Sequence, residues 1–134
     1  SVALLMIDVD HFKAYNDRHG HPAGDDCLQA VVGALKSRVR RPGDLLARYG
    51  GEEFVAVMPG ASPSEAALVA EQLRRRVDEL AHPHGGSTVR PHVTVSIGVA
   101  TLQAQERPDS LQHRADQALY MAKSQGRNRV VSAP

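Results

Sequence analysis

Three pairs of acidic residues have the types and spacing that metal-assisted chemistry requires: Asp8 with Asp10, Asp25 with Asp26, and Glu52 with Glu53. The first pair follows an apolar run and the third follows two glycines, so both are expected at strand ends. Carboxylates that meet at one edge of a sheet repel each other unless a cation lies between them. Such oxygen ligands favour Mg²⁺ or Mn²⁺ bound together with substrate phosphates. For any single pair, the alternative is a solvated strand end or a helix N-cap.

The elements that must position these residues are predicted by the periodicity of the apolar side chains. Strand patterns cover residues 2–8, 45–49, 53–58, 93–100 and 129–132. Helical patterns cover residues 11–18, 25–40, 64–80 and 108–125. The resulting order, β-α-α-β-β-α-β-α-β, predicts an α+β fold of the ferredoxin-like or palm type, in which helices flank a central mixed sheet.

Individual residues predict three local features of these elements. Asp25 or Asp26 is expected to cap the N-terminus of the second helix. Gly50 and Gly51 are expected to form the primed turn of a hairpin between the second and third strands. The segment 82–91 is rich in glycine, proline and histidine, which predicts an exposed loop.

The length and composition limit the class of protein. The chain has 134 residues, enough for one domain (1–134) rather than two. A net charge of +1 and an aromatic content of 4% give no general basis for binding nucleic acid or a membrane surface. One cysteine and the lack of a signal peptide or membrane-spanning run indicate the cytoplasm, including the cytoplasmic part of a larger, membrane-anchored protein. Because a core strand is predicted from residue 2, we expect the domain to be excised from a longer protein.

Several motifs occur in a fixed order along nearly the whole chain, from Val2 to Val131. They read Asp8-Val9-Asp10-His11-Phe12-Lys13, Asn16-Asp17, Gly20-His21, Gly24-Asp25, Arg48-Tyr49-Gly50-Gly51-Glu52-Glu53-Phe54, Ser96-Ile97-Gly98-Val99 and Gly126-Arg127-Asn128. Together they resemble the GGDEF family of diguanylate cyclases, in the variant whose signature is Gly-Gly-Glu-Glu-Phe. The signature alone is weak evidence, whereas the ordered set with compatible spacing is a strong signal.

The resemblance implies a reaction in which two GTP molecules condense into cyclic di-GMP and two pyrophosphates. Each 3′-hydroxyl attacks the α-phosphate of the other GTP, which requires positioning and neutralisation of the developing charge. By the same resemblance, Asp8, Glu52 and the carbonyl of Val9 bind Mg²⁺ or Mn²⁺, and Glu52 and Glu53 occupy the catalytic positions. Asp10 is either a further site residue or a cap for the following helix.

The resemblance also implies how GTP is bound. Asn16 and Asp25 match the pair that reads guanine, whose N1–H and amino groups are donors that a carboxylate accepts. The phosphate-binding positions are Phe12, Lys13, Lys123 and Arg127. Without the resemblance, Asn16 is interpreted as a helix-end residue, Asp25 as an N-cap, and the basic residues as partners of helix dipoles.

Arg41 and Asp44 match the family's inhibitory site, at which the product binds away from the catalytic cleft. A further arginine on the helix after the hairpin often completes this site, but Gln72 stands at that position here. The arginines at 74–76 are the available substitutes. The alternative is that Arg41 and Asp44 form only a charged turn.

The leading hypothesis is therefore an active diguanylate cyclase. Its expected partners are GTP, cyclic di-GMP as product and inhibitor, a second copy of the domain in a transient homodimer, and an upstream sensor domain. Neither nucleic acid nor direct membrane contact is expected. The alternatives are a non-catalytic module that binds GTP or cyclic di-GMP, and a cyclase that makes a mixed dinucleotide.

Overall fold

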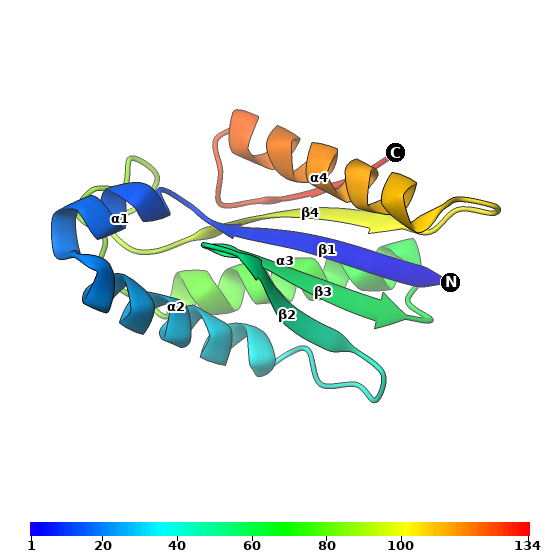
Figure 1. The fold of residues 1–134 in the computed structure, drawn as a ribbon, viewed down its shortest axis with the longest axis horizontal. Helices are drawn as coiled ribbons and strands as arrows, with labels where there is room; N and C mark the ends of the chain where they lie inside the picture. The colour runs from blue at the N-terminus through cyan, green and yellow to red at the C-terminus, as the bar shows by residue number, and fades with distance from the viewer.

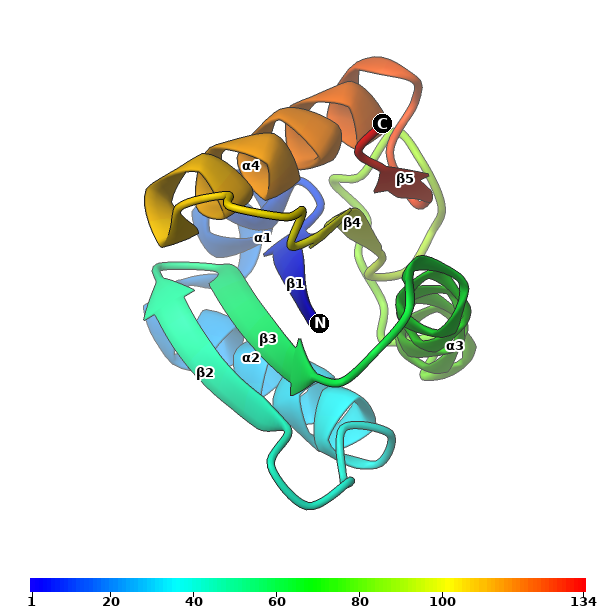
Figure 2. The same cartoon turned by 90° about the vertical axis from the view of Figure 1, so that its right-hand side faces the viewer.

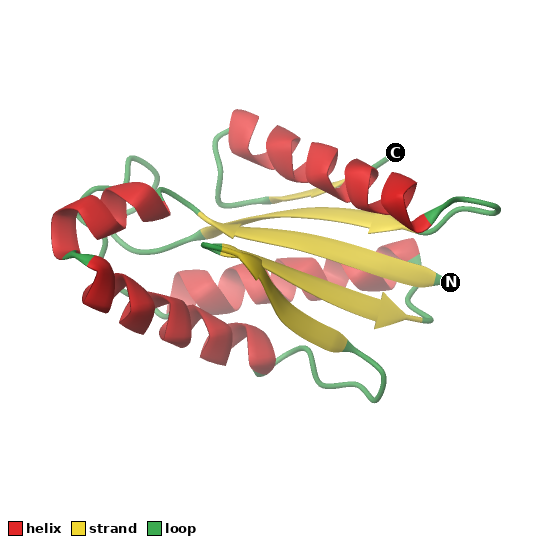
Figure 3. Cartoon of the chain, in the orientation of Figure 1, coloured by secondary structure: helices red, strands yellow, loops and turns green.

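The computed structural model describes residues 1–134 as a single sheet of five strands with four helices (Figure 1). The strands are β1 (Val2–Val9), β2 (Leu45–Gly50), β3 (Glu53–Pro59), β4 (Val95–Thr101) and β5 (Val130–Ser132). The helices are α1 (Phe12–His19), α2 (His21–Lys36), α3 (Pro63–Glu79) and α4 (Pro108–Ser124). Figure 3 shows how the helices surround the sheet. The predicted α+β class and the predicted order of elements are confirmed.

The central strand of the sheet is β1, and the strand order is β2-β3-β1-β4-β5. β1 runs antiparallel to both of its neighbours, β3 and β4, and β5 pairs with β4 in the parallel direction. In this register Asp8, near the end of β1, lies directly opposite Glu53 at the start of β3. The pairing of these strands therefore brings two of the acidic segments of the sequence to one edge of the sheet.

The two faces of the sheet are covered by different helices (Figure 2). On one face, the main core packs the sheet against α2 and α3 and includes Leu5, Ile7, Leu35 and Leu73. On the other face, Met6 and Ala100 pack against Leu111, Ala115 and Leu119 of α4. α4 approaches β4 very closely at Gly98, where an added Cβ would lie 2.3 Å from the carbonyl oxygen of Ala115. This close packing positions the C-terminal end of α4 over the end of β1.

The predicted N-cap of the second helix is wrong. α2 begins at His21, and its N-cap is Gly20, which has a φ of 87°. Pro22 lies in the first turn, where backbone N–H groups have no hydrogen-bond partner within the helix. Its lack of an N–H therefore costs no hydrogen bond, and Pro22 starts this helix rather than interrupting it. Asp25 and Asp26 therefore lie inside α2 and are exposed, which leaves the Asp25 carboxylate without an N-cap role.

The segment 82–91 is a loop, as predicted, but it is exposed only in part. His84 is only 1% exposed, and Pro83 pairs with His92 in an isolated bridge. His82 Nε2 lies 3.0 Å from the Tyr15 hydroxyl, and His92 Nε2 lies 2.6 Å from Asp78 Oδ1. The histidines at 82, 84 and 92 attach this loop and the residue after it to α1 and α3, so they are partly or fully buried rather than solvated.

The β2–β3 hairpin forms as predicted, but its turn is not a primed turn. Neither Gly50 nor Gly51 has the positive φ that a primed turn requires. The register shifts between Arg48 and Gly50, which indicates a bulge at the end of β2. Arg48 Nε and Nη2 donate to the carbonyl oxygen of Gly51 at 2.9 and 2.6 Å and hold the turn.

None of the four helices combines the length and the apolar character that a membrane span requires.

Candidate active site

A cleft of about 150 Å³ opens where β1, the hairpin turn and the end of α4 meet. Its lining residues are Asp8, Val9, Asp10, His11, Phe12, Lys13, Glu52, Lys123 and Arg127. The Val9 N–H donates to the carbonyl oxygen of Glu52 at 3.2 Å, which ties the hairpin turn to the end of β1. The structure thus brings together all the predicted metal-binding and phosphate-binding positions, although they are spread from residue 8 to residue 127.

Asp8 is the most buried carboxylate of the predicted metal set, with only 3% of its surface exposed. Its pKa is raised to about 6, mainly by burial and also by the negative charges of Glu52 and Glu53, while the hydrogen bond and the charge of Lys123 oppose the shift. Lys123 Nζ donates to Asp8 Oδ2 at 2.6 Å. The edge of the sheet therefore concentrates negative charge that a nearby cation stabilises.

The carboxylates at this edge fit a divalent cation that takes its remaining ligands from water and a substrate. Glu52 and Glu53 are both half-buried beside Asp8, and Glu53 is its direct cross-strand partner. The structure contains no group of three histidine, cysteine, aspartate or glutamate side chains arranged to hold a metal by themselves. Mg²⁺ commonly binds to one or two carboxylates and completes its shell with water and substrate phosphates. The residues present fit that mode of binding.

The turn between β1 and α1 provides backbone donors for an anion. His11 has a left-handed conformation, with φ 53°, and no side chain caps the N-terminus of α1. The exposed side chain of Lys13 and the half-buried side chains of Lys123 and Arg127 add positive charge around the cleft. A helix N-terminus with free N–H groups and nearby cations suits a phosphate group.

The buried His84 side chain holds the turn between β1 and α1 in place. Its Nδ1 accepts a hydrogen bond from the N–H of Gly86 at 3.2 Å, so Nε2 carries the proton and donates to the carbonyl oxygen of His11 at 3.0 Å. Burial lowers the pKa of His84, and the nearby side chains of His11, His19 and Arg18 also disfavour its protonation. Sequence reasoning missed this residue, because a histidine in a glycine- and proline-rich segment carries no local signal of burial.

Asp10 is a structural residue in this cleft. Its carboxylate accepts hydrogen bonds from Thr94 Oγ1 and Ser96 Oγ, both at 2.7 Å, and from the N–H of Asn128 at 3.1 Å. It makes no capping bond to α1, so the helix-cap interpretation is wrong. Asp10 instead connects β1 to β4 and to the turn after α4, which is the turn that carries Arg127.

The two predicted guanine-reading residues lie on α1 and α2, and Gly24 links them. Asn16 is in the last turns of α1, and its Oδ1 lies against Gly24, the residue that precedes Asp25 in α2. Asn16 Oδ1 is buried and has no hydrogen-bond partner. Asp25 is exposed and lines a second cavity of about 370 Å³. The other residues of that cavity are Leu28, Gln29, Val32, Arg48 and Phe54.

Arg41 and Asp44 lie at the opposite end of the hairpin from the cleft. Arg41 Nε pairs with Asp44 Oδ2 at 3.1 Å, and Arg41 Nη2 donates to the carbonyl oxygen of Pro59 at 3.4 Å. Pro59 ends β3 and Glu53 begins it, so six residue steps, roughly 20 Å of strand, separate the two places. The Arg41 side chain is 45% exposed, whereas that of Asp44 is 2% exposed. The pair is therefore accessible on the arginine side and lies outside the catalytic cleft.

The arginines near Gln72 have partners of their own. Arg74 and Arg75 both pair with Glu71, and Arg76 Nη1 donates to Ser37 Oγ at 3.0 Å. The Gln72 side chain accepts a hydrogen bond from Arg38, near the end of α2. None of the arginines at 74–76 pairs with Arg41 or Asp44, so the expected substitution by one of them stays a prediction.

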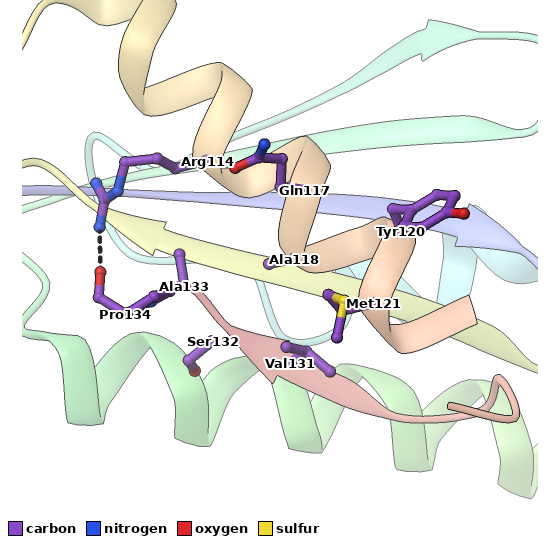
Figure 4. A pocket seen from close by; sticks show the side chains of 9 residues that line it. All are labelled: Arg114, Gln117, Ala118, Tyr120, Met121, Val131, Ser132, Ala133 and Pro134. Carbon is purple, nitrogen blue, oxygen red and sulfur yellow. Dashed lines mark hydrogen bonds between the residues drawn. The ribbon is translucent and has the colours of Figure 1, made fainter. Parts of the chain in front are cut away.

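A further cavity, of about 410 Å³, lies between α4 and β5 and is lined by nine residues shown in Figure 4. The Arg114 guanidinium crosses one end of it and donates to the carbonyl oxygen of Pro134 at 3.0 Å (Figure 4). Tyr120 is 70% exposed and Met121 is 45% exposed beside it. None of the predicted site residues lines this cavity.

Comparison with known sequences gives one family. The profile described as "Diguanylate cyclase, GGDEF domain" matches residues 1–129. Diguanylate cyclase A of Treponema denticola is 44% identical over 132 residues, which make up 98% of this chain and 35% of that protein. The chain thus spans about a third of the length of this relative.

Solved structures of GGDEF and GGEEF domains have the same fold as this chain. The coiled coil and GGDEF domain of DgcB from Caulobacter crescentus, in complex with c-di-GMP, superposes with a TM-score of 0.88 at 36% identity. The match covers 98% of this chain and 69% of that one. The active GGEEF domain of a diguanylate cyclase from Vibrio cholerae superposes with a TM-score of 0.85 at 33% identity, covering 99% of this chain and 83% of that one.

Proposed function

This chain belongs to the GGDEF domain family of diguanylate cyclases, and on that premise we propose that it condenses two GTP molecules into cyclic di-GMP and two pyrophosphates. In each half-reaction, the 3′-oxygen of one GTP bonds to the α-phosphorus of the other, its proton leaves, and pyrophosphate departs. The single observation that carries the proposal is the cleft in which Asp8 and Glu52 face Lys123 and Arg127. Carboxylates and cations within one cleft are what a metal-bound triphosphate requires.

The metal-binding roles in this proposal fall on Asp8, Glu52 and the carbonyl of Val9. Mg²⁺ or Mn²⁺ bound there would neutralise charge on the phosphates as the 3′-oxygen attacks. Glu52 and Glu53 are the proposed catalytic carboxylates, with Glu52 placed to accept the proton of the attacking hydroxyl. The signature Gly50–Phe54 reads Gly-Gly-Glu-Glu-Phe, so we assign the domain to the GGEEF variant.

The chain's own residues would hold GTP by its two ends. The backbone at Phe12 and the side chains of Lys13, Lys123 and Arg127 bind the phosphates in this proposal. Asn16 and Asp25 bind guanine, and the unpartnered Asn16 Oδ1 supports this because it needs a donor such as the guanine amino group. Adenine lacks the adjacent N1–H and 2-amino donors of guanine and would leave the Asp25 carboxylate poorly paired.

The reaction requires two domains. Each copy of the chain provides one set of guanine and phosphate contacts, whereas the product joins two nucleotides in a symmetric ring. We therefore propose a transient homodimer in which two clefts face each other across their hairpin turns, an isologous arrangement. In the longer protein, an upstream sensor domain would bring the two copies together. Arg41 and Asp44 would bind the product cyclic di-GMP and limit the reaction.

Incubation of the purified domain with GTP and Mg²⁺, followed by mass analysis of the products, tests the proposed activity. Formation of cyclic di-GMP and pyrophosphate supports the cyclase. GTP that binds but is never consumed, even when two copies are fused to a dimerising helix, supports the non-catalytic module. A mixed dinucleotide formed from GTP and ATP together would identify the third class of enzyme.

A further inference from the structure

One glycine of α2 lies in direct contact with the asparagine proposed to read guanine. If Gly24 carried a Cβ, that atom would lie 1.8 Å from Asn16 Oδ1 and 2.9 Å from Asn16 Cγ. It would also lie 3.2 Å from Phe12 Cζ. Separations below about 3 Å do not occur between such atoms, so the Asn16 side chain occupies the space that any other residue at position 24 would fill.

Helix geometry does not explain a glycine at this position. Gly24 is the fourth residue of α2 and has no positive φ, so alanine would be compatible with its backbone. Glycine in a helix interior is less favourable than alanine because it loses more conformational freedom on folding. A Cβ added to Gly33, on the same helix, would meet no atom within 4 Å, so the missing side chain there leaves open space. Gly24 differs from Gly33 in having the Asn16 amide against it.

Two hydrogen bonds hold the backbone of Asn16 against the start of α2. The Asn16 carbonyl oxygen accepts a hydrogen bond from the N–H of Gly20 at 2.7 Å, and the Gly20 carbonyl accepts one from the N–H of Gly24 at 3.1 Å. These two bonds place the end of α1 against the first turns of α2. The Oδ1 atom of the Asn16 side chain is buried and has no hydrogen-bond donor. Asp25, whose carboxylate is exposed, follows Gly24 in α2.

We propose that Gly24 determines guanine recognition through Asn16: its missing side chain leaves the space that the Asn16 amide occupies, with the Oδ1 acceptor left for the base. This inference rests on the proposed function, because it assigns guanine as the donor. Gly24 is a positioning residue, since it acts through Asn16 and does not itself touch the nucleotide.

The proposal predicts a specific effect of Gly24→Ala. The closest clash is with the movable end of a side chain rather than with backbone, so the variant should fold with the Asn16 amide displaced. We expect the KM for GTP to rise about tenfold, the value of one well-placed hydrogen bond to a polar partner, with little change in kcat. The preference for GTP over inosine triphosphate, which lacks the 2-amino group, should narrow.

The matched control is Gly33→Ala, the same substitution on the same helix where the space is open. It should keep the parent KM and the parent preference for GTP. A double-mutant cycle with Asn16→Ala then tests the mechanism, because Gly24→Ala should add no further loss once the Asn16 amide is gone. Additive losses, or a parent-like KM in Gly24→Ala, would overturn the proposal.

A measurement without nucleotide separates this inference from the proposed function. In NMR spectra of the ligand-free protein, Gly24→Ala should shift the side-chain amide resonances of Asn16, and Gly33→Ala should leave them in place. If the parent neither binds nor turns over GTP while the Asn16 resonances shift as expected, guanine is not the ligand and the proposed function fails on its own. Unshifted Asn16 resonances in Gly24→Ala would refute the steric contact itself.

Discussion

Lys123 Nζ lies 2.6 Å from Asp8 Oδ2, and this ion pair joins the last helix to the central strand at the proposed catalytic edge. The Asp8 carboxylate is almost fully buried, while the Lys123 side chain is 34% exposed. In this arrangement the ammonium group partly offsets the charge of Asp8, Glu52 and Glu53. A lysine in this position can also contact a phosphate that is bound to the same edge, so the pair connects the metal-binding and phosphate-binding parts of the cleft.

Glu52→Gln is expected to remove turnover and leave the fold intact. The Glu52 side chain makes no ion pair, and its main chain already holds the hairpin to Val9. The substitution keeps the shape but removes the charge proposed to bind the metal and accept the proton. Loss of such a group commonly costs on the order of 10²–10³ in rate. Pyrophosphate release and the melting temperature measure the two effects.

The control for this variant is Glu79→Gln, at an exposed position at the end of α3. It should retain the parent rate and melting temperature. A Glu52→Gln protein that forms cyclic di-GMP as fast as the parent would show that the catalytic carboxylate has been assigned to the wrong residue.

Arg41→Ala is expected to weaken inhibition by cyclic di-GMP and to leave the initial rate largely unchanged. Arg41 lies at the far end of β3 from Glu53, and its guanidinium is accessible to a phosphate or a guanine edge. Titration of cyclic di-GMP into both proteins, followed by calorimetry, gives the two affinities. Arg107→Ala serves as the control, because Arg107 is 83% exposed and remote in sequence from the hairpin. Equal affinity in parent and Arg41→Ala would identify Arg41 and Asp44 as a charged turn.

The activity per molecule of residues 1–134 is expected to rise with protein concentration. Each copy binds one GTP in the proposed mechanism, so the competent species is a dimer whose population follows mass action. A coiled coil fused ahead of Ser1 should raise activity at low concentration if its linker allows the two clefts to face each other. Specific activity measured across a wide dilution series, with sedimentation to establish the oligomeric state, tests this. A constant specific activity from a confirmed monomer would contradict the two-domain mechanism.

His84 is expected to make the folded domain lose stability in mild acid. Its pKa in the folded state lies below the ordinary value of 6.5, because it is buried and because His11, His19 and Arg18 lie near it. The unfolded chain therefore takes up a proton first as the pH falls through about 6.5. The stabilisation is fully present above that pH and decreases below it, by at most about 1.4 kcal/mol per pH unit for one proton.

Urea unfolding at pH 7.5 and pH 5.5 measures this dependence, with His84→Gln as the variant. His84→Gln should be less stable than the parent at the higher pH but should lose less stability on acidification. His113→Gln, at an exposed position on α4, should show the parent's pH dependence. Parallel curves for the parent and His84→Gln would show that the imidazole does not contribute to the acid sensitivity.

Much of the fold and the residue types of the site could be predicted from the sequence, because both depend on local patterns. The helical period of α3 and the alternating and apolar strand patterns of β1 and β4 reflect which side of each element is buried. The signature Gly50–Phe54 is likewise a local feature. The element order and the family follow from such patterns without any knowledge of long-range contacts.

Other features were decided only by the tertiary structure, because they depend on contacts between residues far apart in the chain. Asp10 is a structural residue because Ser96, 86 positions later, donates to it. His84 is buried because its segment packs on α1 and reaches the carbonyl of His11, 73 positions earlier. Gly24 is confined by Asn16 because α1 and α2 meet at Gly20. Periodicity records how much of each side chain is buried on average, but it does not record which partner covers it, so these pairings exist only once the sheet and helices have packed together.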